Sequence, residues 1–295
     1  MRTPIFTGAC TALVTPFDRD GIDAAALINL VNWQIDSGIA ALVACGTTGE
    51  PSTMEDDEWA LALDTIIKAA RGRVPVIAGT GGNNTAHVIR LARRARELGA
   101  DAQLCVTPYY NKSTHAGLIA HYKAISQDGS LPVIIYNVPS RTGLNLAPET
   151  LAELAKLDQV AGVKEASGDI IRLTDMMRLC GDSIAFYTGS DETIVPLMAL
   201  GGLGVISVLS NIAPLETVQL TNAMLSGETQ KAAALQKQLM PLIHALFMEV
   251  NPIPVKAGLA MMGKLDDRLR LPLVSMGESN RAVLKAEMSK LGLLP

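Results

Sequence analysis

Short apolar segments alternate with amphipathic segments along most of the chain. Each apolar segment is rich in small or β-branched residues and is bounded by Gly, Pro, Asn or Thr, which is typical of strands buried on both faces of a parallel sheet. The predicted strands are Cys10–Thr15, Ala41–Cys45, Pro75–Gly79, Ala102–Thr107, Val133–Asn137, Val160–Lys164, Ala185–Thr188 and Gly204–Val208. The amphipathic segments predict helices at Asp23–Ser37, Met54–Ala70, Thr85–Leu98, Thr114–Ser126, Pro148–Lys156, Ile170–Leu179, Glu192–Leu200 and Pro214–Leu225.

This alternation predicts the fold class. Eight strand–helix pairs before Ser226 indicate an α/β fold, a (β/α)8 TIM barrel, because eight parallel strands close into a barrel. The alternative is an open, doubly wound sheet, which is disfavoured because no glycine-rich dinucleotide motif follows the first strand. Several helices have recognisable ends: Ser52 or Thr53 is expected to cap the second helix, and Gly99 and Gly181 are expected to end helices.

The pattern changes beyond Ser226, where the predicted strands stop. Helices are expected at Lys231–Val250, Val255–Met262 and Glu278–Leu291, with a rigid break at Asn251–Pro254. We therefore expect a barrel over residues 1–225 that carries the active site and a small C-terminal α-helical domain over residues 226–295.

Composition and charge exclude several classes of protein. Of the 295 residues 48% are hydrophobic and 18% charged, which is typical of a globular protein, and the net charge is −4. The one cationic stretch, Arg90–Gly99, has the pattern of a solvated helix face, so a nucleic-acid partner is not expected. No apolar run approaches the length of a membrane span and the start lacks a signal-peptide pattern, so we expect a cytoplasmic protein. The dispersed cysteines contain no CxxC pair and are expected to be buried and free.

One lysine interrupts a buried strand. Residues 160–168 read VAGVKEASG, and Lys164 is the only cation in that apolar run. An ammonium group in such surroundings is poorly solvated, which favours the free amine that a carbonyl substrate needs to form a Schiff base. The alternative interpretation is structural: Lys164 pairs with Glu165 or extends to solvent.

Other polar groups follow the predicted strands, and in a barrel of this type the strand ends form the active site. Consecutive threonines in a glycine-rich turn could bind a carboxylate, phenols could transfer protons, and a guanidinium could hold a second carboxylate. These groups occur in the segments GTTGE (Gly46–Glu50), TPYYN (Thr107–Asn111), YNVPSRTG (Tyr136–Gly143) and YTGSDE (Tyr187–Glu192).

Metal and phosphate sites lack sequence support. No predicted strand ends in a histidine, and no His, Asp and Glu cluster has the spacing of metal ligands, so no metal is expected. Gly201, Gly202 and Gly204 precede the last strand and therefore lie at the wrong end of the barrel to hold a phosphate. These features indicate a substrate that carries a carboxylate and no phosphate.

Taken in order, GTTGE, TPYYN, YNVPSRTG and GVKEASGD make the chain resemble the dihydrodipicolinate synthase family. That family belongs to the pyruvate-dependent class I aldolases, which also include N-acetylneuraminate lyase. The resemblance extends from TALVTPFDRDGID, beginning at Thr11, through NPIPVK to the C-terminal helices. GTTGE and the lysine are shared by the whole superfamily, whereas the Tyr109–Tyr110 pair and the loop with Arg141 are more specific.

The resemblance implies a reaction through a covalent intermediate and no separate cofactor. Lys164 would form a Schiff base with pyruvate, and the resulting enamine would add to the aldehyde of L-aspartate 4-semialdehyde. Tyr136 would donate and accept protons. Thr47 and Tyr110 would complete a relay to water, with Tyr110 entering from a neighbouring subunit of a homotetramer that is a dimer of dimers.

The resemblance also assigns the binding residues. Thr48 would hold the pyruvate carboxylate, and the backbone at Gly189 and Ile206 would line its pocket. Arg141 would bind the carboxylate of the semialdehyde. The alternative function is that of an N-acetylneuraminate lyase or 2-keto-3-deoxy acid aldolase, which shares Lys164 and the same Schiff-base chemistry.

One region departs from the members of the family that lysine inhibits. Those members place histidines and a glutamate near the second and third strands, where this chain has Pro51, Ser52, Asp56, Trp59 and His87. We therefore hypothesise that lysine inhibits this protein weakly or not at all.

Overall fold

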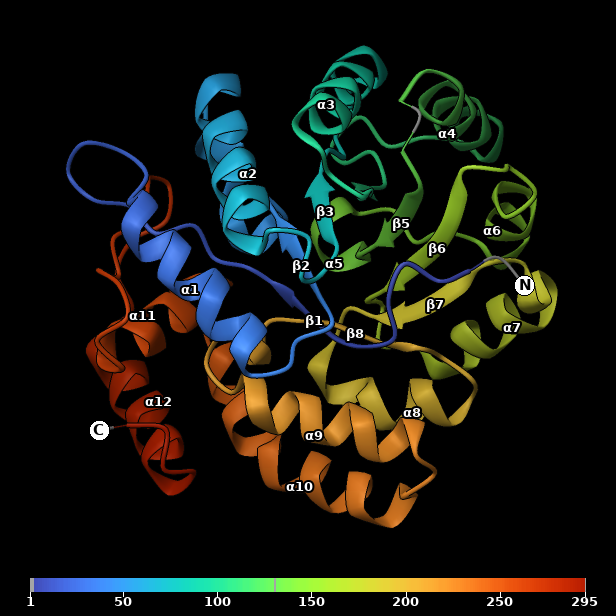
Figure 1. Ribbon diagram of the computed structural model, residues 1–295. Helices are drawn as coiled ribbons and strands as arrows, with labels where there is room; N and C mark the ends of the chain where they lie inside the picture. Colours follow the sequence, from blue (N-terminus) through green and yellow to red (C-terminus); the bar gives the residue numbers. More distant parts are fainter. Residues whose placement is uncertain (1–2, 130, 295) are drawn as a thin grey trace.

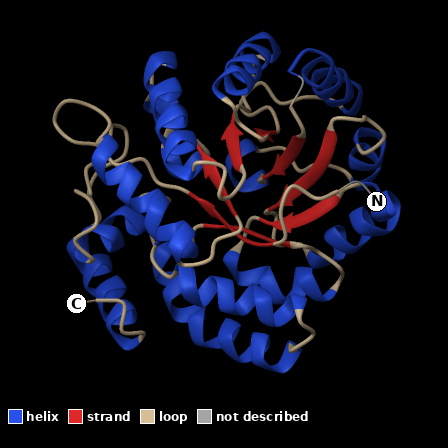
Figure 2. Ribbon diagram, in the orientation of Figure 1, coloured by secondary structure: helices blue, strands red, loops and turns tan. Residues whose placement is uncertain are grey.

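The strands close into a barrel in sequence order. The computed structural model describes residues 3–129 and 131–294. Each strand is parallel to the next, and β8 pairs back with β1 to complete the ring. Figure 2 shows the strands inside a layer of helices. The strands are β1 (Gly8–Ala12), β2 (Ala41–Ala44), β3 (Val76–Gly79), β4 (Ala102–Val106), β5 (Val133–Asn137), β6 (Val160–Glu165), β7 (Ala185–Thr188) and β8 (Gly204–Ser207).

The predicted TIM barrel is therefore confirmed, and most predicted boundaries hold within a few residues. The helices of the surrounding layer are α1 (Ala24–Asp36), α2 (Asp56–Ala70), α3 (Thr85–Leu98), α4 (His115–Gly129), α5 (Pro139–Thr142), α6 (Pro148–Leu154), α7 (Ile170–Cys180), α8 (Ile194–Ala199) and α9 (Pro214–Leu225). Gly99 and Gly181 end α3 and α7 as predicted.

Three local predictions need correction. Glu55, and neither Ser52 nor Thr53, precedes α2, because Pro51–Thr53 forms a separate short 3-10 turn. The backbone N–H of Glu55 donates a hydrogen bond to the side chain of Glu58. The two residues form a capping box in which Glu55 takes the place of the usual serine or threonine. The chain also forms the short helix α5 where a loop was expected, and a 3-10 turn precedes α8.

Apolar side chains form two layers, one on each side of the strands. The inner layer fills the barrel and includes Cys10, Ile77, Ile134 and Ile206. The outer layer packs between the strands and the helices. Because both faces of every strand are buried, the strands read as near-continuous apolar runs, which explains why the sequence pattern located them well.

Three further helices follow the barrel: α10 (Thr229–Leu246), α11 (Ile253–Met261) and α12 (Glu278–Lys290). α10 lies along α9, and α12 packs against α10 and α11 (Figure 1). All four cysteines are buried and free, as predicted. Within residues 3–129 and 131–294, no helix combines the length and apolar character that crossing a bilayer requires.

Candidate active site

Lys164 lies near the carboxyl end of β6 with its side chain inside the barrel. Its side chain is buried, and the neighbouring strand β5 places Tyr136 directly beside it in register. The Lys164 Nζ atom is 4.3 Å from the centroid of the Tyr136 ring. The structure thus brings together the predicted nucleophile and the predicted proton donor.

Gly189, just after β7, flanks Lys164 on the other side of β6. The N–H of Gly189 donates to the carbonyl of Glu165, which holds the backbone after β7 against β6. A Cβ atom added at Gly189 would lie 2.6 Å from Cε of Lys164, so any larger residue here would displace the lysine side chain. Ile206 on β8 is fully buried in the inner layer.

Glu165 has other partners than Lys164. Its carboxylate accepts hydrogen bonds from Nδ2 of Asn137, at 2.8 Å, and from the N–H of Ser167, at 2.7 Å. Oδ1 of Asn137 accepts a bond from the N–H of Leu146 in turn. Glu165 therefore braces the loop that carries Arg141, and this geometry disfavours the structural interpretation in which Lys164 and Glu165 form a pair.

The GTTGE segment forms a tight turn at the barrel mouth, with a 3-10 turn at Thr47–Gly49. Thr48 is buried, and its hydroxyl oxygen accepts a hydrogen bond of 2.9 Å from Nδ2 of Asn251. Glu50 adopts a left-handed conformation, with φ of 58°. That conformation directs the chain from the turn towards α2.

A buried ion pair anchors this turn to the C-terminal helices. Nζ of Lys256, in α11, lies 2.8 Å from Oε1 of Glu50, and both side chains are completely buried. Lys256 also donates to the carbonyl of Thr15, at 3.0 Å. Burial lowers the pKa of Lys256, and the adjacent Glu50 carboxylate opposes that shift.

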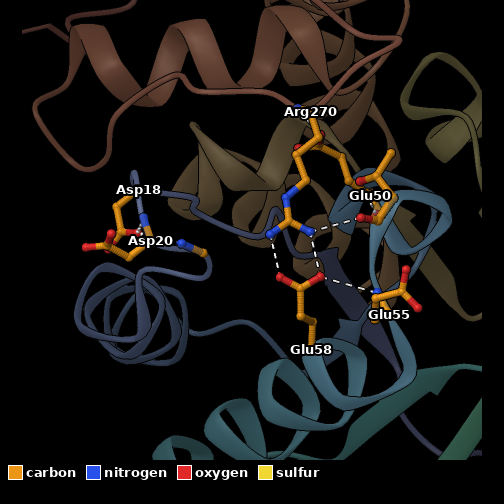
Figure 3. Close-up of polar contacts among 8 residues, drawn as sticks. Asp18, Asp20, Glu50, Glu55, Glu58 and Arg270 are labelled. Carbon is orange, nitrogen blue, oxygen red and sulfur yellow. Dashed lines mark hydrogen bonds and ion pairs between the residues drawn. The ribbon is translucent and has the colours of Figure 1, made fainter.

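Arg270 joins the same region from the loop after α11. Figure 3 shows its guanidinium group facing Glu58, to which it donates two hydrogen bonds. The Arg270 side chain also donates to the carbonyl of Thr53, at 2.9 Å. The hydrogen bonds from Arg270 hold the pKa of Glu58 below its ordinary value.

A cavity of about 490 Å³ opens beside these groups. It begins at Thr47, Tyr136 and Arg141 and extends between α2 and α3, as its lining residues show. The outer part is lined by Ser52, Asp56, Trp59, Asn83, Asn84, His87 and Tyr109. Its size suits small organic substrates.

Comparison with known proteins assigns the family. Residues 5–291 match the model of the Dihydrodipicolinate synthetase family. The chain belongs to the Dihydrodipicolinate synthetase family. A 4-hydroxy-tetrahydrodipicolinate synthase of Thermoanaerobacter sp. (strain X514) is 49% identical over 292 residues, covering 99% of this chain and 98% of that protein. The synthase of Caldicellulosiruptor saccharolyticus is 50% identical, with 98% of each chain covered.

Solved structures agree with this assignment to the Dihydrodipicolinate synthetase family. The dihydrodipicolinate synthase of Thermotoga maritima superposes with a TM-score of 0.97 at 41% identity, over 98% of this chain and 100% of that one. The chloride-inhibited enzyme of Acinetobacter baumannii, solved with pyruvate, gives a TM-score of 0.96 at 42% identity, over 98% of this chain and 99% of that one. The family comprises class I aldolase-type lyases, as the sequence predicted.

Two tyrosines behave differently from the rest of the predicted site. Tyr110 follows β4 but is 93% exposed, so the relay of Tyr110 and Thr47 is not assembled within a single chain of this family member. Tyr187, in the strand-end segment YTGSDE, does not contribute a phenol to the mouth. Its hydroxyl donates to the carbonyl of Phe6, at 2.8 Å, and the two rings stack 4.2 Å apart, because the side chain fills the barrel interior.

Sequence reasoning missed three residues that organise the mouth: Asn251, Lys256 and Arg270. Lys256 carried a detectable signal, because it is the one cation in the apolar run IPVKAGLAM, just as Lys164 is in its strand. The sequence around Asn251 and Arg270 gave no such signal, because their partners, Thr48 and Glu58, lie more than 200 residues away along the chain.

Proposed function

We propose that the protein condenses pyruvate with L-aspartate 4-semialdehyde through a Schiff base on Lys164, the 4-hydroxy-tetrahydrodipicolinate synthase reaction. The observation that carries the proposal is the buried Lys164 amine beside Tyr136, whose side chain lines the same cavity as Thr47 and Arg141. The names of the family relatives support the same reaction and its place in the diaminopimelate route to lysine.

The first half of the reaction activates pyruvate. The free amine of Lys164 adds to the keto carbon, and loss of water gives the imine. The protonated imine withdraws electrons, so a methyl proton leaves and an enamine forms. Tyr136 carries protons in these steps, and Thr47 with Tyr110 of a neighbouring subunit connects it to water.

The second half forms the new carbon–carbon bond. The enamine carbon adds to the aldehyde, and the amine of the semialdehyde then displaces Lys164 as the ring closes. Thr48 holds the pyruvate carboxylate in the pocket formed by Gly189 and Ile206, and Arg141 holds the carboxylate of the semialdehyde. The covalent bond to pyruvate takes the place of a cofactor.

The proposal includes a cytoplasmic homotetramer, a dimer of dimers. The exposure of Tyr110, 93% in the single chain, supports a role across a subunit interface. The hypothesis of weak or absent inhibition by lysine also stays a prediction. The residues on which it depends all line the cavity: Pro51, Ser52, Asp56, Trp59 and His87.

Borohydride trapping tests the proposal. Reduction in the presence of pyruvate is expected to add the mass of a reduced pyruvate adduct to the peptide containing Lys164 and to abolish activity. An unmodified Lys164 would favour a metabolite-binding barrel without catalysis. Cleavage of a sugar acid without turnover of the semialdehyde would instead favour an N-acetylneuraminate lyase or a 2-keto-3-deoxy acid aldolase.

A further inference from the structure

The side chain of Asn251 makes a single hydrogen bond with a defined direction. Asn251 is 6% exposed, and its Nδ2 donates to Oγ1 of Thr48 at 2.9 Å. Its Oδ1 atom has no donor in the part of the chain that the structure describes. Among the described residues, the side-chain amide of Asn251 therefore hydrogen-bonds only to Thr48.

The direction of that bond determines what Thr48 can do. A threonine hydroxyl carries one hydrogen and can donate only one bond. Because Asn251 donates to the oxygen, the hydrogen of Thr48 stays free, and no acceptor for it occurs among residues 3–129 and 131–294. A free hydroxyl hydrogen at the barrel mouth suits a carboxylate ligand.

We infer that Asn251 is a positioning residue, which orients the Thr48 hydroxyl so that it donates to the pyruvate carboxylate. This inference rests on the proposed function, because it assigns that carboxylate to Thr48. Asn251 itself does not touch substrate. Asn251 belongs to the C-terminal segment. That segment contacts the turn at the barrel mouth twice, through the bond from Asn251 to Thr48 and through the Lys256–Glu50 ion pair.

The backbone of Asn251 has a second, separable contact. Its carbonyl oxygen accepts a hydrogen bond from Nη2 of Arg141 at 3.1 Å. A side-chain substitution removes the bond to Thr48 and leaves this carbonyl in place. The KM values for the two substrates should therefore respond differently to the substitution, because Thr48 binds pyruvate and Arg141 binds the semialdehyde in the proposed site.

Asn251→Asp is the sharpest variant, because aspartate has the shape of asparagine but only accepts hydrogen bonds when ionised. The Thr48 hydroxyl would turn its hydrogen to Asp, and a negative charge would lie behind the pyruvate carboxylate. We expect the KM for pyruvate to rise about tenfold or more, as loss of a charge-assisted hydrogen bond typically produces. The KM for the semialdehyde should change by less than about threefold.

Three controls accompany this variant. Asn32→Asp on α1 makes the same amide-to-carboxylate change away from the mouth, where Oδ1 already accepts a bond from Arg73, and should leave both KM values unchanged. Thr48→Val removes the hydroxyl itself and should raise the KM for pyruvate. Asn251→Ala completes a double-mutant cycle with Thr48→Val, and in the double variant their effects on this KM should be strongly less than additive, because both act on one hydroxyl.

The outcomes distinguish the role of Asn251 from the proposed function. A wild-type KM for pyruvate in Asn251→Asp, with a raised KM in Thr48→Val, overturns the role of Asn251 and leaves the proposed function standing. An unchanged KM in Thr48→Val removes Thr48 from the proposed site. Equal losses for both substrates together with a lower Tm, or additive effects in the double variant, show that Asn251 is only structural and also overturn the inference.

Discussion

Gly189 lies so close to Lys164 that a single methyl group on its backbone would occupy the space of the lysine chain, with Cβ 2.6 Å from Cε. The backbone of Gly189 does not require positive φ, so alanine is tolerated by the local conformation. Gly189→Ala is therefore expected to displace the nucleophile without unfolding the barrel. Misplacement of about 1 Å typically costs about 100-fold in rate, so kcat should fall by about that factor.

Steady-state kinetics and the rate of borohydride trapping measure this loss. Gly258→Ala on α11 is the matched control, because an added Cβ there would meet its nearest neighbours at ordinary contact distance, 3.4 Å from atoms of Ile212 and Met288. Wild-type kcat in Gly189→Ala would show that Lys164 has another path to the mouth. A large drop in Tm would show that Gly189 is required for folding instead.

The pair of Lys256 and Glu50 predicts a strong effect on stability. Lys256→Met keeps the length of the side chain but leaves the buried Glu50 carboxylate without its ion-pair partner. Removal of one partner of a buried pair typically costs about 3–5 kcal/mol in the free energy of unfolding. Urea denaturation followed by circular dichroism measures this cost.

Two comparisons make this experiment specific. Lys231→Met removes an exposed pair with Glu228, which should cost less than about 1 kcal/mol. The double variant Lys256→Met/Glu50→Gln should recover part of the loss, because no buried charge remains. If Lys256→Met is as stable as the Lys231→Met control, the buried pair does not anchor the turn at the barrel mouth.

The barrel could be predicted because its strands are buried on both faces and its helices are amphipathic, so each element shows its own local pattern. Lys164, Tyr136 and Gly189 could be placed together for a related reason, since all lie at or just after a strand end. The contacts of Asn251, Lys256 and Arg270 could not be predicted, because they join segments far apart in the sequence that no local hydrophobic pattern links. The division into residues 1–225 and 226–295 stays a prediction, and these contacts join the second part to the barrel mouth of the first.

Acid sensitivity should depend on Glu58. Its pKa is lower in the folded protein than its ordinary value, chiefly through the hydrogen bonds from Arg270. The ionised form is therefore favoured by folding. This stabilisation is present above the ordinary carboxyl pKa and is lost as the pH falls through the lower, folded value.

Glu58→Gln should consequently flatten the loss of stability at acid pH. Urea midpoints measured from pH 7 down to about pH 3 would show a shallower slope than wild type below about pH 4.5. Glu97→Gln, which removes an exposed pair with Arg94, should keep the wild-type slope. The same slope in Glu58→Gln and wild type would show that other groups govern acid unfolding.

Arg141 should affect one substrate much more than the other. It lines the cavity, and its guanidinium group is fixed by the carbonyl of Asn251. Arg141→Ala is expected to raise the KM for the semialdehyde by about tenfold to 100-fold, the range for loss of a charge-assisted contact. The KM for pyruvate and the borohydride trapping of pyruvate should change little. Initial-rate kinetics with each substrate varied test this, and equal effects on both KM values would contradict the assignment.

Tyr110 provides the test of the shared active site. Tyr110→Phe removes a hydroxyl that is almost entirely exposed in the single chain, so Tm should stay the same. If the hydroxyl completes the proton relay of a neighbouring subunit, kcat should fall about 100-fold or more, the usual contribution of a positioned proton-transfer group. Tyr109→Phe alters the adjacent phenol, which lines the cavity of its own chain, and serves as the comparison.

Mixed oligomers then show in which chain Tyr110 acts. Lys164→Ala subunits keep Tyr110, and Tyr110→Phe subunits keep Lys164, so each variant alone is nearly inactive. Unfolding and refolding the two together should restore activity, because some sites then combine an intact Lys164 with an intact Tyr110 from the neighbour. Separately refolded variants that are mixed afterwards are the control. Absence of restored activity in verified mixed oligomers would show that Tyr110 does not act across the interface, since a hydroxyl shared between subunits must complement in trans.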